Sequence, residues 1–165
     1  TSSRFYFVWC VTMSTEDISA LVSQLDVTSS RKEEAVWAQL REHGVALMPY
    51  FRAAYPRFRK WQGRTSLVYH AIRYGRSNED AFQLGLAALQ DKAQVVRYRA
   101  CMLLAYALRA EALSALAACA NHADPKTAAD AHAAIDAIRN RNHHYFVDRD
   151  HSGMMRWVVC PEDER

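Results

Sequence analysis

The chain has 165 residues and a mass of 18.8 kDa, which suits a single domain with a substantial hydrophobic core. Half of its residues are hydrophobic, and only 5 are glycine and 4 proline, a composition that excludes disordered and collagen-like chains. The formal net charge of +3 is too small to indicate a class of partner, although the charges are unevenly distributed along the chain.

Membrane insertion and secretion have no support in the sequence. No apolar run approaches the ~18 residues that a membrane-spanning helix needs. The apolar run Phe5–Val11 is short for a signal sequence, and Met13 is the expected biological start, so that residues 1–12 form an upstream segment. There is no Cys-x-x-Cys pair, and free thiols fit a reducing compartment; the cysteines are Cys10, Cys101, Cys119 and Cys160. We therefore expect a cytoplasmic protein.

Three helices are predicted in the first third of the chain. Ser14 and Asp17 have the spacing of a capping box, and the apolar residues that follow recur on one helical face. A serine at position 29 or 30 caps the second helix, and Gly44 supplies the left-handed conformation that ends it. The third helix begins near Pro49.

From Arg64 onward the helical pattern becomes regular. Helices are predicted over about 64–74, 91–108, 111–120 and 124–140. A further helix is predicted between the first two, and Ser77 with Asp80 caps its start. Asp124 followed by Pro125 is a strong start signal. The short links between these helices indicate antiparallel neighbours.

This regularity has a period of 33 residues. The pattern Val96-Arg97-x-x-Ala100 follows Asp91, and Ala129-Asp130-x-x-Ala133 follows Asp124 at the same distance; Gly63-Arg64-x-x-Leu67 lies one interval earlier. A fixed period of about 20–50 residues is typical of stacked repeats, in which each unit completes the core of its neighbour.

The pattern Asp91-x-x-x-x-Val96-Arg97-x-x-Ala100-x-x-x-Leu104 resembles a HEAT-type α-helical repeat, including the variety first noted in phycobilisome lyases. The resemblance covers about residues 64–140 and implies an all-α fold, an α-α superhelix of stacked antiparallel helix pairs. It implies that Asp91 caps the second helix of its unit and that Arg97 reaches a neighbouring unit, so that Asp91, Arg97 and Asp124 form a structural ladder. Repeats of this kind mostly serve as interaction surfaces, and the resemblance implies no catalytic residues.

Two positions depart from that ladder. The unit that begins at Asp124 has Asp130 where the arginine is expected, so we expect the ladder to be interrupted there. The unit before Asp91 has Arg64 but carries Phe58 at the position of the aspartate.

A β-hairpin is predicted at the C-terminal end, with strands at about 145–149 and 154–159. The runs around Tyr145 and Trp157 are β-like, and Ser152-Gly153 between them suits a turn. Two strands alone are marginal in water, so Trp157 or Tyr145 should lie against the last helix. The chain then divides into a helical-repeat domain, residues 13–142, and a hairpin with a polar tail, residues 143–165.

The same segment contains the only candidates for a metal site. Asp148-x-Asp150-x-Ser152-Gly153 matches the first half of a calcium loop, but Val159 stands where a bidentate carboxylate is required, and a turn is the simpler interpretation. Zinc or nickel is the alternative, with histidines beside Asp148, but no spacing matches a zinc motif. We therefore predict no cofactor and no metal; the residues in question are Asp148, Asp150, His143, His144 and His151.

A basic segment is the main candidate for binding a partner. Between Glu42 and Glu79 there is no acidic residue, and basic side chains alternate with aromatic ones. Such side chains bind single-stranded nucleic acid, or carboxylates on a protein partner, and they also occur on a solvated face over core aromatics. One continuous patch requires the two ends of the segment to fold together. The predicted contact residues are Arg52, Arg57, Arg59, Lys60, Trp61, Arg64, Arg73 and Arg76.

From these observations we expect a non-enzymatic protein–protein interaction module. An armadillo-like adaptor or a toxin-neutralising immunity protein would fit, with a partner protein that presents an acidic surface. The first alternative is a nucleic-acid-binding protein that uses the basic, aromatic-rich segment 50–76. The second is an enzyme or metal-dependent protein that uses the cluster His143–His151, although neither a Gly-x-Ser-x-Gly motif nor a glycine-rich phosphate loop is present.

Overall fold

The computed structural model describes residues 12–164, and all regular secondary structure in that range is helical. The prediction of an all-α fold is therefore confirmed. The α-helices are α1 (Thr15–Ser23), α2 (Ser30–Leu40), α3 (Met48–Ala54), α4 (Trp61–Ala71), α5 (Glu79–Ala88), α6 (Gln94–Ala107), α7 (Leu113–Cys119) and α8 (Pro125–Arg139). Short 3-10 helices cover Arg41–Leu47, Tyr55–Arg57, Ile72–Tyr74, Ala110–Ala112, His143–Phe146 and Pro161–Glu164. The apolar run Phe5–Val11 lies outside the described residues, with nearly all of the predicted upstream segment 1–12.

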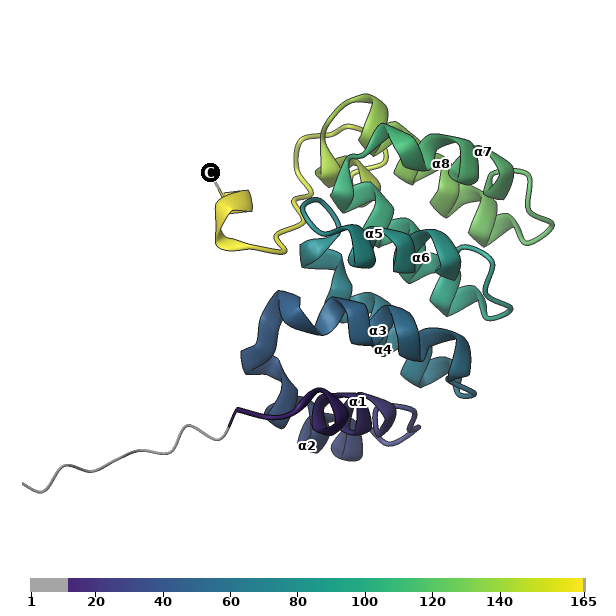
Figure 1. The fold of residues 1–165 in the computed structure, drawn as a ribbon. Helices are drawn as coiled ribbons and strands as arrows, with labels where there is room; N and C mark the ends of the chain where they lie inside the picture. Colours follow the sequence, from purple (N-terminus) through teal and green to yellow (C-terminus); the bar gives the residue numbers. More distant parts are fainter. Residues whose placement is uncertain (1–11, 165) are drawn as a thin grey trace, which may run out of the picture.

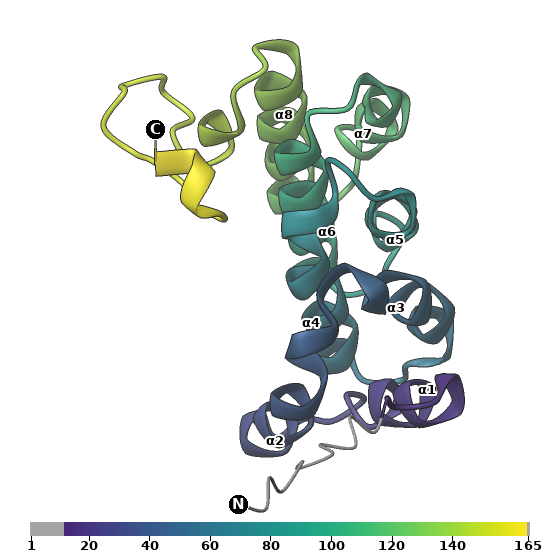
Figure 2. The same cartoon turned by 60° about the vertical axis from the view of Figure 1, so that its left-hand side comes forward.

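The helices form two rows, which Figure 1 shows face-on and Figure 2 shows from the side. In Figure 2, α2, α4, α6 and α8 follow one another in one row, and α1, α3, α5 and α7 in the other. Within the first row α4 contacts α6 and α6 contacts α8, while α5 packs on α6 and α7 on α8 across the rows. The C-terminal segment after α8 lies on the free side of the first row (Figure 2).

Local capping signals set three of the helix starts as predicted, and one of them is Ser29, whose hydroxyl accepts from the N–H of Lys32 at the start of α2. The hydroxyl of Ser14 accepts from the backbone N–H of Asp17, whose carboxylate accepts from the N–H of Ser14, so the predicted capping box is present. The carboxylate of Asp124 accepts from the N–H of Lys126 at the start of α8. Each bond satisfies a backbone donor that the first turn of a helix leaves unpaired.

The predicted cap at Asp91 is wrong, because α6 begins three residues later. Its N-cap is Ala93, which has no side-chain acceptor. The carboxylate of Asp91 accepts one bond from the N–H of Ala93 at 2.8 Å, and its remaining capacity is taken by side chains of the preceding helices. The carboxylate of Asp91 therefore bonds the N-cap residue and tertiary partners instead of the first turn of α6.

Arg64 of α4 is the first of two buried arginines that link successive units. Its guanidinium forms two hydrogen bonds to the carboxylate of Asp91, Nε to Oδ2 at 2.6 Å and Nη2 to Oδ1 at 3.0 Å. Its Nη1 donates to the carbonyl oxygens of Phe58 and Arg59, at 3.3 and 3.0 Å. This contact needs only the backbone of Phe58, so it forms although the residue is not an aspartate.

Arg97 of α6 repeats these contacts 33 residues later. Its Nη1 donates to the carbonyl oxygens of Asp91 and Lys92, at 2.8 and 3.0 Å. Its Nη2 lies 3.1 Å from the carboxylate of Asp124, and its Nε donates to the hydroxyl of Thr127 at 2.9 Å. The side chain is nearly fully buried and bridges α6 to the start of α8.

In the next ion pair, the helix supplies the carboxylate, from Asp130 of α8, instead of the guanidinium. Asp130 lies 33 residues after Arg97, at the position that the sequence period gives to an arginine, and its carboxylate accepts a hydrogen bond from Nη2 of Arg149 at 2.8 Å. Nε of Arg149 also donates to the carbonyl of Phe146. The guanidinium therefore comes from the C-terminal segment, which this pair fastens to the last helix.

The predicted C-terminal hairpin is wrong, since none of the residues 143–164 forms a strand. The backbone groups of Trp157 that a strand partner would engage are bound by side chains instead. Its N–H donates to Nδ1 of His144 at 3.0 Å, and its carbonyl accepts from Nε2 of His143 at 2.9 Å. Trp157 itself packs against Tyr106 of α6 and against Phe146. The segment is therefore an irregular strap held by side chains, which we call the C-terminal strap (residues 147–164).

Candidate binding cleft

The basic residues predicted to bind a partner do not form one surface. Arg64 is buried in its pair with Asp91, with only 7% of its side chain exposed. Arg52 pairs with Asp80 of α5 at 3.0 Å. Arg76 donates two hydrogen bonds to the carbonyl oxygen of Tyr106, at 3.1 and 2.7 Å, and its guanidinium lies over that tyrosine ring. These three arginines have structural partners.

The remaining predicted residues lie at opposite ends of α4. Arg57, Arg59 and Lys60 precede the helix, and Trp61 is its first residue. Arg73 follows the helix in the 3-10 turn Ile72–Tyr74. A helix of this length spans roughly 16 Å, so the basic segment is divided into two groups.

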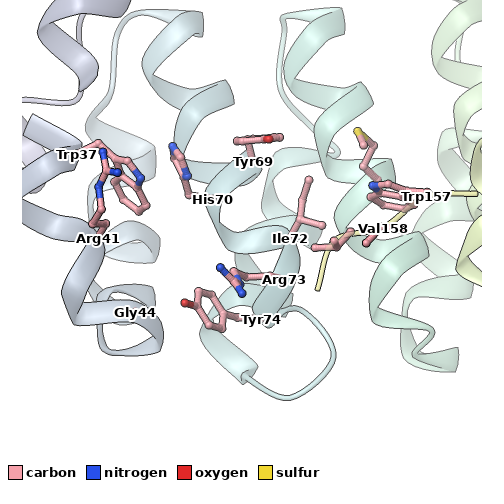
Figure 3. A pocket seen from close by; sticks show the side chains of 12 residues that line it. Trp37, Arg41, Gly44, Tyr69, His70, Ile72, Arg73, Tyr74, Trp157 and Val158 are labelled. Carbon is pink, nitrogen blue, oxygen red and sulfur yellow. The ribbon is translucent and has the colours of Figure 1, made fainter. Parts of the chain in front are cut away.

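Arg73 lies in a cleft of about 560 Å³ between the first helical row and the C-terminal strap. Figure 3 shows Trp37 and Arg41 on one side, Trp157 and Val158 on the other, and Ile72 and Arg73 between them. This volume is typical of clefts that hold a small molecule or a few side chains of a partner. The complete lining is Trp37, Arg41, Gly44, Tyr69, His70, Ile72, Arg73, Tyr74, Met102, Trp157, Val158 and Val159.

Aromatic rings form much of the cleft wall, and packing holds two of them in place. The ring of Trp37 stacks on His70 with centroids 3.8 Å apart, and it also contacts Phe51 in the core. Trp157 is held by its edge contacts with Tyr106 and by the backbone bonds to two histidines described above. Rigid flat surfaces of this kind bind other rings at a low entropic cost.

The electrostatics of the cleft are weakly positive. Arg41 pairs with Glu34, so its charge is largely compensated. For Arg73, no carboxylate of the described residues lies within ion-pair distance; its polar contact is the Sγ of Cys160 at 3.9 Å. Burial lowers the pKa of His70 to about 4 although Glu33 and Glu34 act to raise it, so the 3.9 Å approach of Glu33 is not an ion pair at pH 7. Arg73 is thus the main uncompensated charge.

A second hollow of about 270 Å³ adjoins the cleft and shares Tyr69 with it. Its lining residues are Glu33, Trp61, Gln62, Thr65, Ser66, Tyr69 and Arg99. Tyr69 is 51% exposed and Trp61 is 44% exposed, which is unusual for rings of this size. The guanidinium of Arg99 lies 4.9 Å from the ring centroid of Tyr69. The two hollows form one aromatic and cationic groove along α4, which we call the α4 groove.

Polar atoms without partners also lie at the second hollow. Nε of Arg99 and Oγ1 of Thr65 are buried and have no hydrogen-bond partner among the described residues. The hydroxyl of Ser66, in contrast, donates to the carboxylate of Glu33 at 2.5 Å. Buried polar atoms are usually paired, so these two atoms are exceptions, and both are withdrawn from solvent.

The predicted metal candidates serve structural roles. The carboxylate of Asp148 accepts from the hydroxyl of Ser152 and from the N–H groups of Ser152 and Gly153, and this bonding lowers its pKa. His151 lies 2.5 Å from the carboxylate of Asp136 and stacks on Tyr145. Asp150 is exposed, and within residues 12–164 no group of three histidine, cysteine or acidic side chains is placed to hold a metal ion.

Sequence reasoning missed several residues of the groove. Trp157 was expected to pack against the last helix, and Trp37, Arg41 and Arg99 were not singled out. One signal was present: Trp61, Thr65 and Tyr69 recur at a spacing of four, which places them on one face of α4. That this face is exposed follows only from the packing of the rows.

Comparison with known proteins gives no assignment, because no family model, no curated protein and no solved structure matches the chain. Among the helices of residues 12–164, none combines the length and the apolar character needed to cross a membrane. The groove therefore has to be interpreted from its own geometry.

Proposed function

We propose that the chain is a non-enzymatic binding protein, built as a superhelix of HEAT-like helix pairs, that holds an acidic segment of a partner protein in the α4 groove. One observation carries this proposal. The two adjoining hollows bring the exposed aromatic rings of α4 together with the guanidinium groups of Arg73, in the turn after α4, and of Arg99 on α6. Tryptophan, tyrosine and arginine are the residues that contribute most to protein–protein binding energy.

The HEAT-like part of the proposal is supported by the matching contacts of two arginines. Arg64 and Arg97 each bind two consecutive carbonyls before their own helix and an aspartate 27 residues further along the chain. Such equivalence is expected when successive units stack in the same way. It agrees with the 33-residue period of the sequence.

Charge distribution favours a protein partner over nucleic acid. Binding of single strands relies on a continuous row of cations along the backbone path. Here the basic segment is divided, and Glu33 lines the second hollow. A protein segment with one or two carboxylates between apolar side chains matches these few cations better. An adaptor and an immunity protein both act in this way, and genomic neighbourhood would separate those two roles.

Affinity capture from the lysate of the source cells tests the proposal. The wild-type chain should retain a protein partner both with and without nuclease treatment. Replacement of Tyr69 by Ala together with Arg73 by Gln should abolish capture, while Arg57→Gln, outside the groove, should preserve it. Arg64 is unsuitable for such a test, because its replacement would leave the buried carboxylate of Asp91 without its ion-pair partner.

An oligonucleotide titration covers the alternative. Tight binding of mixed oligonucleotides at about 50 mM salt, weakening steeply at about 200 mM and lost in the groove variant, would replace the protein-partner proposal by the nucleic-acid one. Capture that vanishes after nuclease treatment would have the same consequence. We expect neither.

A further inference from the structure

The cleft of the α4 groove has an apolar part and a charged part. Trp37, Ile72, Met102 and Trp157 present carbon surface on its walls. At its other end Arg73 and Tyr74 lie close together, with Arg41 across from them (Figure 3). A ligand that fills the cleft therefore needs a flat apolar body and an anionic end.

The charges of the lining specify a single anion. Arg41 is compensated by Glu34, and His70 is neutral at pH 7 because burial depresses its pKa. Glu33 lies on the far side of His70, where it lines the second hollow. Arg73 remains, and one guanidinium balances one carboxylate, to which its planar fork can donate two parallel hydrogen bonds.

We propose that this cleft is a pocket for an aromatic ring that carries one carboxylate close to it, presented by the acidic segment of the partner protein. The inference rests on the proposed function and names the group of the partner that enters the cleft. The ring packs on the apolar wall beside Arg73, against Ile72 and Trp157, and the carboxylate binds Arg73. Tyr74, beside Arg73, offers a phenolic hydroxyl as a second donor.

Indole-3-acetate is a suitable probe, because it carries the ring and the carboxylate without requiring the partner. Titration calorimetry with the full chain should show saturable binding with one site. Two control ligands separate the contributions: indole-3-ethanol keeps the ring without the charge, and cyclohexylacetate keeps the charge without the aromatic ring. Both should bind at least about tenfold more weakly, since a hydrogen bond to a charged group and the stacking of a ring each contribute on that scale.

Variants locate the binding to the cleft. Arg73→Met should lower the affinity for indole-3-acetate by roughly 10- to 100-fold, the range expected for loss of a charge-assisted hydrogen bond. Arg73→Lys should lie between that variant and the wild type, because it keeps the charge but not the fork. Arg57→Met removes an arginine from the other end of α4 and should leave the affinity unchanged. Circular dichroism on each variant verifies the fold, and Arg73→Lys serves as the test should Arg73→Met fail to fold.

Three results would overturn the inference: no saturable binding of indole-3-acetate at millimolar concentration, equal binding of indole-3-ethanol, or equal losses in the Arg57 and Arg73 variants. A second arm distinguishes a partner segment from a free small acid. Peptides that contain an Asp-Trp pair should compete with indole-3-acetate for the wild-type chain; if they do not compete, the cleft takes a free acid and the partner-segment form of the inference is wrong. Partner capture that survives Arg73→Met would also contradict this inference while leaving the proposed function intact.

Discussion

Arg64 and Asp91 form a two-point ion pair in which both side chains are almost withdrawn from solvent, with 7% and 4% of their surface exposed. The hydroxyl of Tyr55 donates a third bond to the same carboxylate at 2.5 Å. Burial works against the charge of Asp91, but the bonds from Arg64 and Tyr55 outweigh it and lower the pKa of the carboxyl. The pair links α3, α4 and the approach to α6 at one point.

Replacement of Asp91 by Ala should therefore destabilise the chain strongly. It leaves the guanidinium of Arg64 and the hydroxyl of Tyr55 without their acceptor, and removal of one partner from a buried pair costs about 3–5 kcal/mol. Urea denaturation followed by circular dichroism measures the loss. Arg52→Ala breaks the exposed pair with Asp80 and should cost at most about 1 kcal/mol. Similar losses in the two variants would contradict the structural role of the buried pair.

Gly63 sets how closely α4 approaches the link between α1 and α2. A Cβ at this position would lie 2.9 Å from the Cα of Asp26 and 2.9 Å from the carbonyl oxygen of Leu25, both backbone atoms. In an open helix Gly→Ala stabilises by about 1 kcal/mol, but here the overlap should reverse the sign and cost about 1–3 kcal/mol. Thermal unfolding of Gly63→Ala, with Gln62→Ala as the neighbouring control, measures the difference. A stabilised Gly63→Ala would show that the link moves aside freely.

Local signals of the sequence predicted much of the fold. Ser14 and Asp124 act through backbone groups only a few residues away, and both cap their helices as predicted. Asp91 has the same local appearance, but its carboxylate is bound by Arg64 and Tyr55, which lie 27 and 36 residues earlier. Asp124 is bound by Arg97 in the same way and still caps α8, so the tertiary contact that Asp91 alone has is the bond from Tyr55, which no local pattern contains.

The C-terminal strap and the candidate site could not be predicted from sequence patterns, because they too depend on tertiary contacts. The β-like run around Trp157 gains its hydrogen bonds from the rings of His143 and His144, so it needs no partner strand. The cleft joins Trp37 to Trp157, 120 residues apart, across a helical row whose exposed face depends on the stacking of all units. The sequence shows that this segment is basic. It does not show which of its arginines are buried and which are exposed, because that depends on the tertiary fold.

Arg149 should control the attachment of the C-terminal strap. Its guanidinium joins Asp130 of α8 to the carbonyl of Phe146. Arg149→Ala leaves the nearly buried carboxylate of Asp130 unpaired, so we expect faster hydrogen exchange at the backbone N–H of Trp157, with exchange in the centre of α6 unchanged. Arg139→Ala, on the exposed end of α8, is the matched control. Unchanged exchange at Trp157 would mean that the ring contacts of the strap are sufficient to hold it.

His70 should make stability depend on pH between about 4 and 6.5. Its pKa is lowered from 6.5 to about 4, chiefly by burial against Trp37, so between these values the unfolded chain binds a proton that the folded chain does not. The contribution to stability is therefore complete above pH 6.5 and is lost as the pH falls towards 4. The loss should amount to about 1–3 kcal/mol.

His70→Phe retains a ring for stacking on Trp37 but cannot titrate, so its stability should fall less over the same range. Part of the slope will persist in that variant, because burial also lowers the pKa of His143. Urea denaturation of both proteins at pH 7, 5.5 and 4.5 measures the difference, and parallel curves would show that His70 takes up its proton in the folded chain as readily as in the unfolded one.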